Sequence, residues 1–119
     1  MESIDLAKEI VKILDSKKAD NVEAIKVKDL TIVTDYFVIA SATNTTHVKS
    51  LVDEVEFKLK EKFSLYPKSV DGYGGSNWIA LDYLDVVVHI FYEPTRNEYN
   101  LEKLWSDGES VDISSWIEE

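Results

Sequence analysis

The sequence predicts an α+β domain in which a mixed β-sheet of about five strands is covered by helices. Two segments, residues 4–14 and 48–63, carry apolar side chains at helical spacing. The segments between and after them carry apolar residues in alternation or in short continuous runs, as strands do. Because the helices are divided among strands, with an antiparallel return near each end, a mixed sheet covered by helices is expected.

Length and composition limit what this domain can be. The chain has 119 residues, enough for a single domain with one core, and it contains no cysteine. The lack of cysteine excludes disulfide scaffolds, thiolate zinc sites and cysteine nucleophiles. The acidic start runs straight into helical periodicity, and the longest stretch without a charge, Tyr36–Val48, is too polar to span a bilayer. A soluble cytoplasmic protein is therefore expected.

The first elements expected are an amphipathic helix and a strand. Ser3 is the candidate N-cap, and Asp20-Asn21 is expected to end the helix. Its apolar stripe consists of Ile4, Ala7, Ile10, Val11 and Leu14. From Val22 to Leu30 the apolar period changes to two, which predicts a strand with polar residues facing outward.

A fully buried strand and a second helix are expected next. Residues 36–40 form a continuous apolar run, which is typical of a strand covered on both faces. The polar turn over residues 41–46 supplies several N-cap candidates. An amphipathic helix of about four turns then follows, with a stripe made of Val48, Leu51, Val52, Val55, Leu59 and Phe63.

A short strand and a hairpin are expected in the last third of the chain. The short strand surrounds Val70, and the glycine-rich stretch after it bends the backbone. Residues 78–82 and 86–91 are predicted to be the two hairpin strands, and residues 83–85 their turn.

The C-terminal part is expected to contain a short helix and a tail. Pro94 ends the hairpin, and the helix spans Tyr99–Trp105. Residues 106–119 form an acidic C-terminal tail whose docking onto the domain is left open. The tail has four apolar residues that could make such contacts: Val111, Ile113, Trp116 and Ile117.

The charge balance favours a protein partner over a nucleic acid. The net charge is −10, and five acids but no base follow Trp105. Binding to nucleic-acid phosphates requires lysine and arginine side chains that displace counterions, so direct binding to RNA or DNA is not expected. Attraction to a basic protein surface is favoured. The simpler alternative is that the acidity only keeps the protein soluble.

The sequence offers little catalytic or metal-binding chemistry. The glycines of residues 72–75 are followed neither by a lysine nor by a helix that would present amides to a phosphate. His47 and His89 each lack a histidine partner four residues away, so a zinc site is not expected. His47 is expected to be exposed and His89 to be a structural strand residue. We therefore predict no catalytic residue, no metal and no cofactor.

One alternative is a metal-dependent nucleotide-binding or nucleotidyltransferase-like enzyme that uses Asp82, Asp85 and His89. Such enzymes follow a Gly-Ser turn with two carboxylates two residues apart, which together hold two magnesium ions. Gly75-Ser76 is present, but the position two residues after Asp85 is Val87. A single carboxylate cannot bridge a metal pair, so this alternative is disfavoured.

Aromatic residues next to acids indicate a different kind of site. Trp78 and Tyr83 bound a predicted strand that also carries Asp82, and Asp85 follows in the turn. Aromatic anchors beside acids are suited to bind a basic protein. We predict a partner-binding site of Trp78, Asp82, Tyr83 and Asp85, with Asp71 adding charge. The competing interpretation places Trp78 in the core.

Four blocks of the chain stand out together and in order: Lys18-Ala19-Asp20-Asn21-Val22, residues 34–43 (Thr-Asp-Tyr-Phe-Val-Ile-Ala-Ser-Ala-Thr), residues 75–91 and residues 96–105. With these blocks, residues 4–105 resemble the ribosomal silencing factor (RsfS/Iojap) family. The resemblance implies a fold related to nucleotidyltransferases that has lost the catalytic acids. It also implies binding to the large ribosomal subunit through the basic ribosomal protein uL-fourteen, with little nucleic-acid contact, and a steric block to small-subunit joining that lowers translation.

Three further expectations concern the direction of side chains on the strand of residues 78–82, the turn of the hairpin, and self-association. Ile79 and Leu81 should point away from Trp78 into the core. Ala42 and Leu84 stand where the family usually has glycine, and the hairpin is expected to accommodate Leu84 by a longer or differently twisted turn. A homodimer that buries an exposed apolar strand face is a third hypothesis, and it could compete with the ribosome for one surface.

Overall fold

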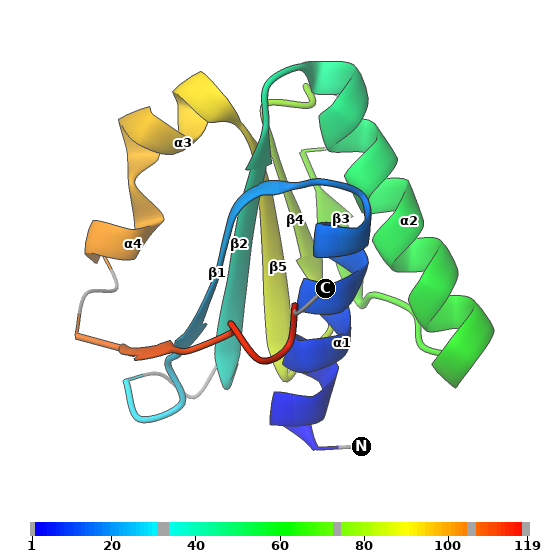
Figure 1. Ribbon diagram of the computed structural model, residues 1–119, viewed down its shortest axis with the longest axis vertical. Coiled ribbons are helices and arrows are strands. Elements are labelled where there is room, and N and C mark those ends of the chain that lie inside the picture. The colour runs from blue at the N-terminus through cyan, green and yellow to red at the C-terminus, as the bar shows by residue number, and fades with distance from the viewer. Residues whose placement is uncertain (1, 31–33, 73–74, 105–106, 118–119) are drawn as a thin grey trace.

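A mixed six-stranded sheet forms the centre of the computed structural model, which describes residues 2–30, 34–72, 75–104 and 107–117. The strand order is β3-β4-β5-β2-β1-β6, with β2 and β5 parallel and every other neighbouring pair antiparallel. Helices α1 and α2 cover one face, whereas α3 and α4 lie against the other (Figure 1). The predicted α+β class with a mixed sheet is confirmed, and the sheet has one strand more than expected.

The N-terminal helix and the first strand form as expected, with shifted boundaries. Helix α1 spans Ser3–Ser16 and has Glu2 as its N-cap, so the assignment of Ser3 as the cap is wrong. The Asp5 carboxylate accepts a hydrogen bond from the Glu2 backbone N–H at 3.3 Å, which satisfies a free donor at the helix start. Strand β1 spans Asp20–Lys26. Leu30 was expected in this strand, but it lies in the following turn and is 45% exposed.

Strand β2 and helix α2 follow the sequence pattern closely. Strand β2, Tyr36–Ala42, is almost completely buried because helices pack on both of its faces. Helix α2 spans Thr45–Phe63, and the Asn44 side chain caps it by accepting from the His47 backbone N–H at 2.7 Å. Phe63 was expected on the buried stripe, but it is 37% exposed at the last helical position.

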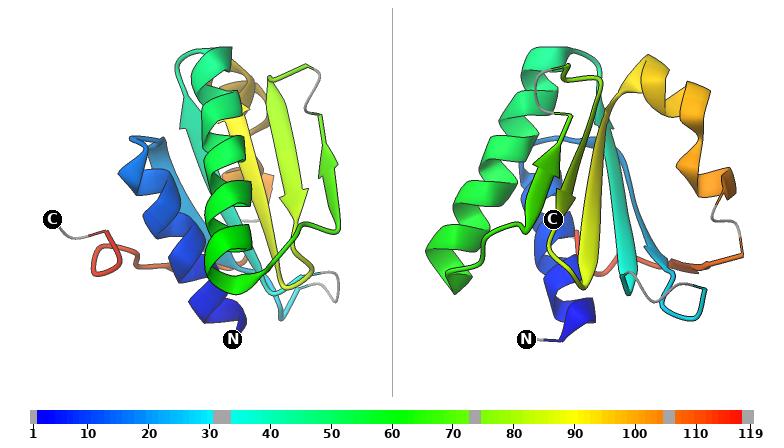
Figure 2. Two further views of the ribbon diagram at one scale, coloured as in Figure 1. Left: turned by 90° about the vertical axis from the view of Figure 1, so that its right-hand side faces the viewer. Right: turned by 180° about the vertical axis from the view of Figure 1, so that it is seen from behind.

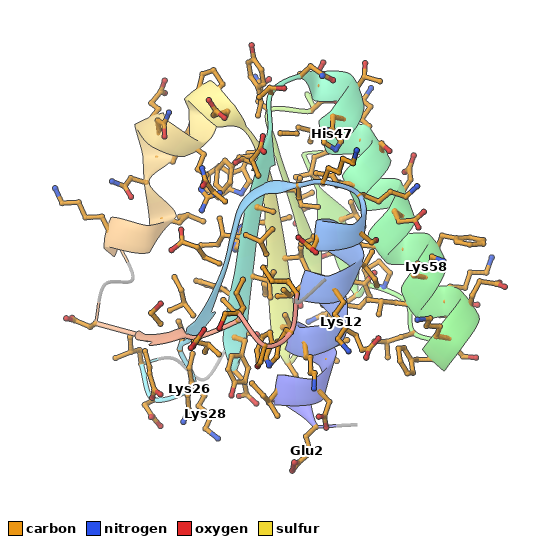
Figure 3. All side chains as sticks on the ribbon, in the orientation of Figure 1. Glu2, Lys12, Lys26, Lys28, His47 and Lys58 are labelled. Carbon is orange, nitrogen blue, oxygen red and sulfur yellow. The ribbon has the colours of Figure 1, made fainter. Side chains whose placement is uncertain are left out.

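His47 was expected to be an exposed side chain without contacts, but it bonds to the end of α1. Its ring Nε2 lies 2.8 Å from the carbonyl oxygen of Lys17, the C-cap residue of α1, and donates to it. Figure 3 shows His47 at the start of α2, close to the end of α1. The bond therefore connects the two helices on this face.

The short strand and the hairpin are confirmed. Strand β3 spans Ser69–Asp71, β4 spans Trp78–Asp82 and β5 spans Val86–Tyr92. Gly72 has φ +85°, and a Cβ there would come 2.1 Å from the Trp78 carbonyl oxygen, so the approach of this loop to β4 requires glycine.

The hairpin turn differs from the expectation. Leu84 has φ 74°, and the Asp85 backbone N–H donates to the Tyr83 carbonyl oxygen at 2.9 Å, which closes a tight γ-turn. The turn is therefore not longer, and leucine adopts the conformation that usually favours glycine. The other departure, Ala42, is fully buried at the end of β2 in extended backbone.

The C-terminal elements were only partly anticipated. Helix α3 begins immediately after β5 and spans Glu93–Tyr99, with Pro94 in its first turn, and α4 spans Leu101–Leu104. The helix expected over residues 99–105 is confirmed only for residues 101–104: Tyr99 belongs to α3, and Asn100 adopts a left-handed conformation (φ 50°) that separates the two helices. Trp105 lies outside the described residues.

A short strand from the tail extends the sheet. Strand β6, Glu109–Val111, pairs antiparallel with β1. The partly buried side chains of Val111, Ile113, Trp116 and Ile117 pack against the main core. Figure 2 shows this segment crossing from β1 to the side of α1. The edge of β1 is thus covered by the end of the chain.

Two hydrophobic clusters lie on the two faces of the sheet. The larger one lies between the sheet and helices α1 and α2, and it contains Ile79 and Leu81, both 0% exposed, as expected. The smaller one lies toward α3 and α4 and consists of Ile25, Val27, Ile39, Phe91 and Leu101, with Phe37 and Trp78 packed against it. Within the described chain, no helix is long and apolar enough to cross a membrane.

Candidate protein-binding face

The face of the sheet opposite α1 and α2 is only partly covered. Helices α3 and α4 lie over β1, β2 and the end of β5, and on this side they leave β3, β4 and the first half of β5 uncovered (Figure 2). On β2, β3, β4 and β5, strand alternation and the cross-strand register place seven accessible or partly accessible residues on this side. We call this set the open sheet face: Phe37, Ser69, Asp71, Trp78, Ala80, Asp82 and Val87.

Trp78 is the anchor of the open sheet face. Its ring stacks on Phe91 with a centroid distance of 5.0 Å and an interplanar angle of 24°, and it contacts Tyr99 of α3 at 4.8 Å. The indole Nε1–H donates a hydrogen bond to His89 Nδ1 at 3.0 Å. The side chain still remains partly exposed. Trp78 therefore packs on the smaller cluster and also reaches the surface, which combines the two interpretations.

His89 lies beneath the open sheet face, surrounded by aromatic rings. The ring is 8% exposed and meets Phe37 edge-on at a centroid distance of 5.0 Å. Burial lowers the pKa of His89 from 6.5 to about 4, so the ring is neutral at physiological pH. Its Nε2 is buried and has no hydrogen-bond partner among the described residues.

The predicted acids are distributed along the edge of this face. Asp71 on β3 pairs with Ala80 of β4, and Asp82 ends β4 on the same side as Trp78. At the usual rise per strand residue, Trp78 and Asp82 are about 13 Å apart. Asp85 is exposed in the turn, and none of these three acids forms an ion pair with another described residue. The acids are therefore available to a cationic surface.

Tyr83 requires a correction. It was predicted as a contact residue, but its side chain is 6% exposed and belongs to the larger cluster on the opposite side of the sheet. Burial, together with the negative charge of Glu56 on α2, raises the pKa of the Tyr83 hydroxyl. Strand alternation explains its direction: residue 83 has the parity of Ile79 and Leu81, so its side chain points with theirs toward the helices. Tyr83 does not share the face of Trp78.

The residues of the enzyme alternative do not converge on a ligand. Nδ1 of His89 accepts the Trp78 hydrogen bond, and Asp82 Oδ1 accepts a hydrogen bond from the Leu84 backbone N–H at 2.8 Å. Among the residues with described positions, no group of three or more histidine, cysteine, aspartate or glutamate side chains could hold a metal ion. These groups serve the hairpin and the aromatic cluster instead.

Arg96 positions α3 beside the open sheet face. Its guanidinium is buried, forms a 2.7 Å ion pair with Glu23 of β1, and donates to the Asn21 carbonyl oxygen at 2.7 Å and to Ser41 Oγ at 3.1 Å. These bonds connect α3 to two strands and so hold Tyr99 against Trp78. No local pattern in the sequence indicates this role, because the partners of Arg96 are 55 to 75 residues away in the chain.

A shallow hollow adjoins Trp78 at the upper end of the face. Its volume is about 390 Å³, and it lies between the β3–β4 loop and α3. The residues around it include Asn77, Thr95, Glu98 and Tyr99. The partly exposed side chain of Trp78 thus lies next to a recess with room for a side chain from a partner.

The fold and the open sheet face together define the class of protein. It is an α+β domain whose mixed sheet leaves one aromatic face, flanked by acids, partly uncovered. The lysines labelled on α1 and α2, Lys12 and Lys58, project on the other side of the molecule (Figure 3). The acids of the open sheet face are thus separated from these bases by the sheet.

The chain belongs to the ribosomal silencing factor family. The family described as "Ribosomal silencing factor during starvation" matches residues 1–119, and the match includes the acidic tail. Ribosomal silencing factor RsfS of Halalkalibacterium halodurans is 32% identical over 117 residues, which cover 98% of this chain and 99% of that protein.

A eukaryotic relative and a solved structure agree with this membership. The Mus musculus protein named mitochondrial assembly of ribosomal large subunit protein 1 is 33% identical over 100 residues, which cover 82% of this chain and 43% of the mouse protein. A crystal structure of a protein from Chromobacterium violaceum has a TM-score of 0.85 at 27% identity and covers 89% of this chain and 88% of that one.

Proposed function

We propose that this protein is a ribosomal silencing factor that binds the large ribosomal subunit and sterically prevents the small subunit from joining. Membership of the family supports a regulatory role on the ribosome rather than a catalytic one. The name of the mouse relative supports the large subunit as the target. In this mechanism the protein represses translation by occupying a surface and performs no chemical reaction.

The observation that carries the proposal is the placement of Trp78. A tryptophan that is held rigidly by two rings and one hydrogen bond, yet remains partly exposed, has already lost much of the conformational entropy that binding would cost. Such aromatic anchors typically dominate the binding energy of protein interfaces. We therefore propose that Trp78 is the anchor of the contact, with Phe37 and Val87 further along the same face.

Charge supports a basic protein as the direct partner. Asp71, Asp82 and Asp85 flank the anchor without internal ion pairs among the described residues, and the whole chain has a net charge of −10. Basic ribosomal protein surfaces would attract this face, whereas exposed ribosomal RNA would repel it. We propose ribosomal protein uL-fourteen as the direct contact on the large subunit.

The test compares variants of the open sheet face with matched variants on the helix-covered side. Trp78→Ala is expected to weaken co-sedimentation with isolated large subunits by roughly 30-fold, the effect of a hot-spot residue. Asp82→Asn keeps the acceptor for the Leu84 N–H but removes the charge, so it should weaken binding mainly at low salt. Phe57→Ala, which removes an exposed aromatic ring of α2, should bind normally.

Two readouts complete the test. The wild-type protein should stop purified subunits from associating in a sucrose gradient, and Trp78→Ala should not do so at the same concentration. A direct pull-down with purified uL-fourteen tests the assignment of the partner. Full activity of folded Trp78→Ala in both assays would exclude the open sheet face as the binding site.

A homodimer could use the same face, since Phe37, Trp78 and Val87 form a partly exposed apolar surface. Light scattering over a range of protein concentrations measures this assembly. If the dimer and the ribosome share one surface, adding uL-fourteen should convert dimers into heteromeric complexes, and Trp78→Ala should be monomeric.

A further inference from the structure

We propose that His89 is a positioning residue for the interaction with the ribosome: its Nδ1 fixes the orientation in which the Trp78 indole is presented to the partner. This inference rests on the proposed function, because it assigns a task to a residue that supports the anchor of the open sheet face. His89 itself is 8% exposed and is not proposed to touch the partner.

The register of the hairpin makes this contact possible. Trp78 pairs with Phe91, and Ala80 pairs with His89, so His89 and Trp78 are diagonal neighbours on the same face. Because the residue paired with His89 is alanine, no bulky side chain separates the two rings. The result is the 3.0 Å hydrogen bond from the indole Nε1–H to Nδ1, with a centroid distance of 5.9 Å between the rings.

The hydrogen bond determines the protonation of the imidazole. An indole N–H can only donate, so Nδ1 must be the unprotonated acceptor and the ring proton must reside on Nε2. Nε2 is buried without a hydrogen-bond partner among the described residues. A position that served only to fill space would be occupied more favourably by an apolar residue, since an unsatisfied buried donor is costly. The useful group of His89 is therefore Nδ1.

The remaining contacts of Trp78 do not define its orientation by themselves. Phe91 provides a flat surface on which the indole can slide or turn over. Tyr99 is 55% exposed at the last position of the seven-residue helix α3. A directional hydrogen bond adds the constraint that stacking lacks. Its loss should make the free protein less ordered at the anchor, and ordering the anchor again during binding weakens affinity by about tenfold.

The experiment compares His89→Leu with His89→Asn. Leucine fills the site without an acceptor, whereas the Oδ1 of asparagine is attached to the same Cγ position as Nδ1 and can accept the indole N–H. We expect His89→Leu to bind isolated large subunits about tenfold more weakly, and His89→Asn to recover most of that loss. Equal weakening by both variants would show that only packing matters and would overturn the inference.

A spectroscopic readout reports on the hydrogen bond itself. The indole N–H resonance of Trp78, assigned with Trp78→Phe, should move upfield and exchange faster with solvent in His89→Leu than in His89→Asn. If neither variant folds, the inference is tested on the wild-type protein by determining which ring nitrogen of His89 carries the proton. A long-range nitrogen–proton spectrum should show the proton on Nε2 of His89, and a proton on Nδ1 would overturn the inference.

The result for Trp78→Ala separates this inference from the proposed function. If Trp78→Ala binds fully, the proposed binding face is wrong, and the role of His89 falls with it. If Trp78→Ala binds weakly while folded His89→Leu binds as the wild type does, only the inference about His89 is wrong.

Discussion

The buried imidazole of His89 predicts a specific loss of stability in mild acid. The pKa of His89 is lowered to about 4 in the folded protein, whereas the unfolded chain has a value near 6.5. Burial is the cause, and the rings packed on it from β2, β4 and β5 are the uncharged Phe37, Trp78 and Phe91. Asp82 lies on the same face of β4 but is engaged with the hairpin turn.

The sign follows from proton binding. Below the pKa of the unfolded state, the unfolded chain binds a proton that the folded chain does not, so acid favours unfolding. The contribution of His89 is fully present above about pH 7 and is lost as the pH falls from about 6.5 toward about 4. Between about pH 8 and pH 5.5 the two pKa values give a loss of about 1.4 kcal/mol in the free energy of unfolding.

The assay is urea unfolding of wild type and His89→Asn at both pH values. Asparagine does not titrate, so acid effects common to the two proteins cancel, and the wild type should lose about 1.4 kcal/mol more than the variant, or about 5 °C in Tm. About pH 5.5 also remains above the pI of 4.6, which limits precipitation.

A direct titration provides the second measurement. The chain has two histidines, so His47→Gln identifies the ring-proton signals of His89. These signals should remain unchanged until the pH falls below about 5. Equal stability losses in the two proteins, or a His89 signal that titrates near its ordinary value, would refute the argument that burial keeps this ring neutral.

Two further substitutions test the surroundings of the binding face. Leu84→Gly should raise the free energy of unfolding by about 1 kcal/mol, because Leu84 has φ 74° and glycine adopts this conformation without strain; thermal unfolding measures it, and an unchanged or lower Tm would contradict the strain argument. Arg96→Met should destabilise the protein by about 2 kcal/mol, because Ser41 and the Asn21 carbonyl lose a buried donor while Glu23 remains half exposed. Faster hydrogen exchange confined to α3 would support the role of Arg96 in docking this helix, and uniform protection would contradict it.

The regular elements of this protein were predictable from periodicity. The apolar stripe of α1, the continuous run of β2 and the alternation of β4 are local patterns that each require burial on particular sides. They were sufficient to predict the mixed sheet, the hairpin and the core positions of Ile79 and Leu81, because side-chain direction in a regular strand depends only on parity.

Short elements and turns were not predictable in the same way. Helix α3 has seven residues and β6 has three, too few to establish a period, and β6 forms only because β1 offers an unpaired edge. Leu84 lies in the turn after β4, so its positive φ depends on turn closure. The direction of Tyr83, in contrast, follows from the same parity that places Ile79 and Leu81 in the core.

At the candidate site, too, only part could be predicted from local patterns. The amino-acid order alone specifies a tryptophan followed by acids on one strand, and an excess of negative charge. The folded chain adds that Trp78 rests on Phe91 and bonds to His89, and that Tyr99 of α3 packs on its ring. These neighbours follow from the register that the tight turn sets between β4 and β5, and from the docking of α3 by bonds of Arg96 to residues distant in the chain.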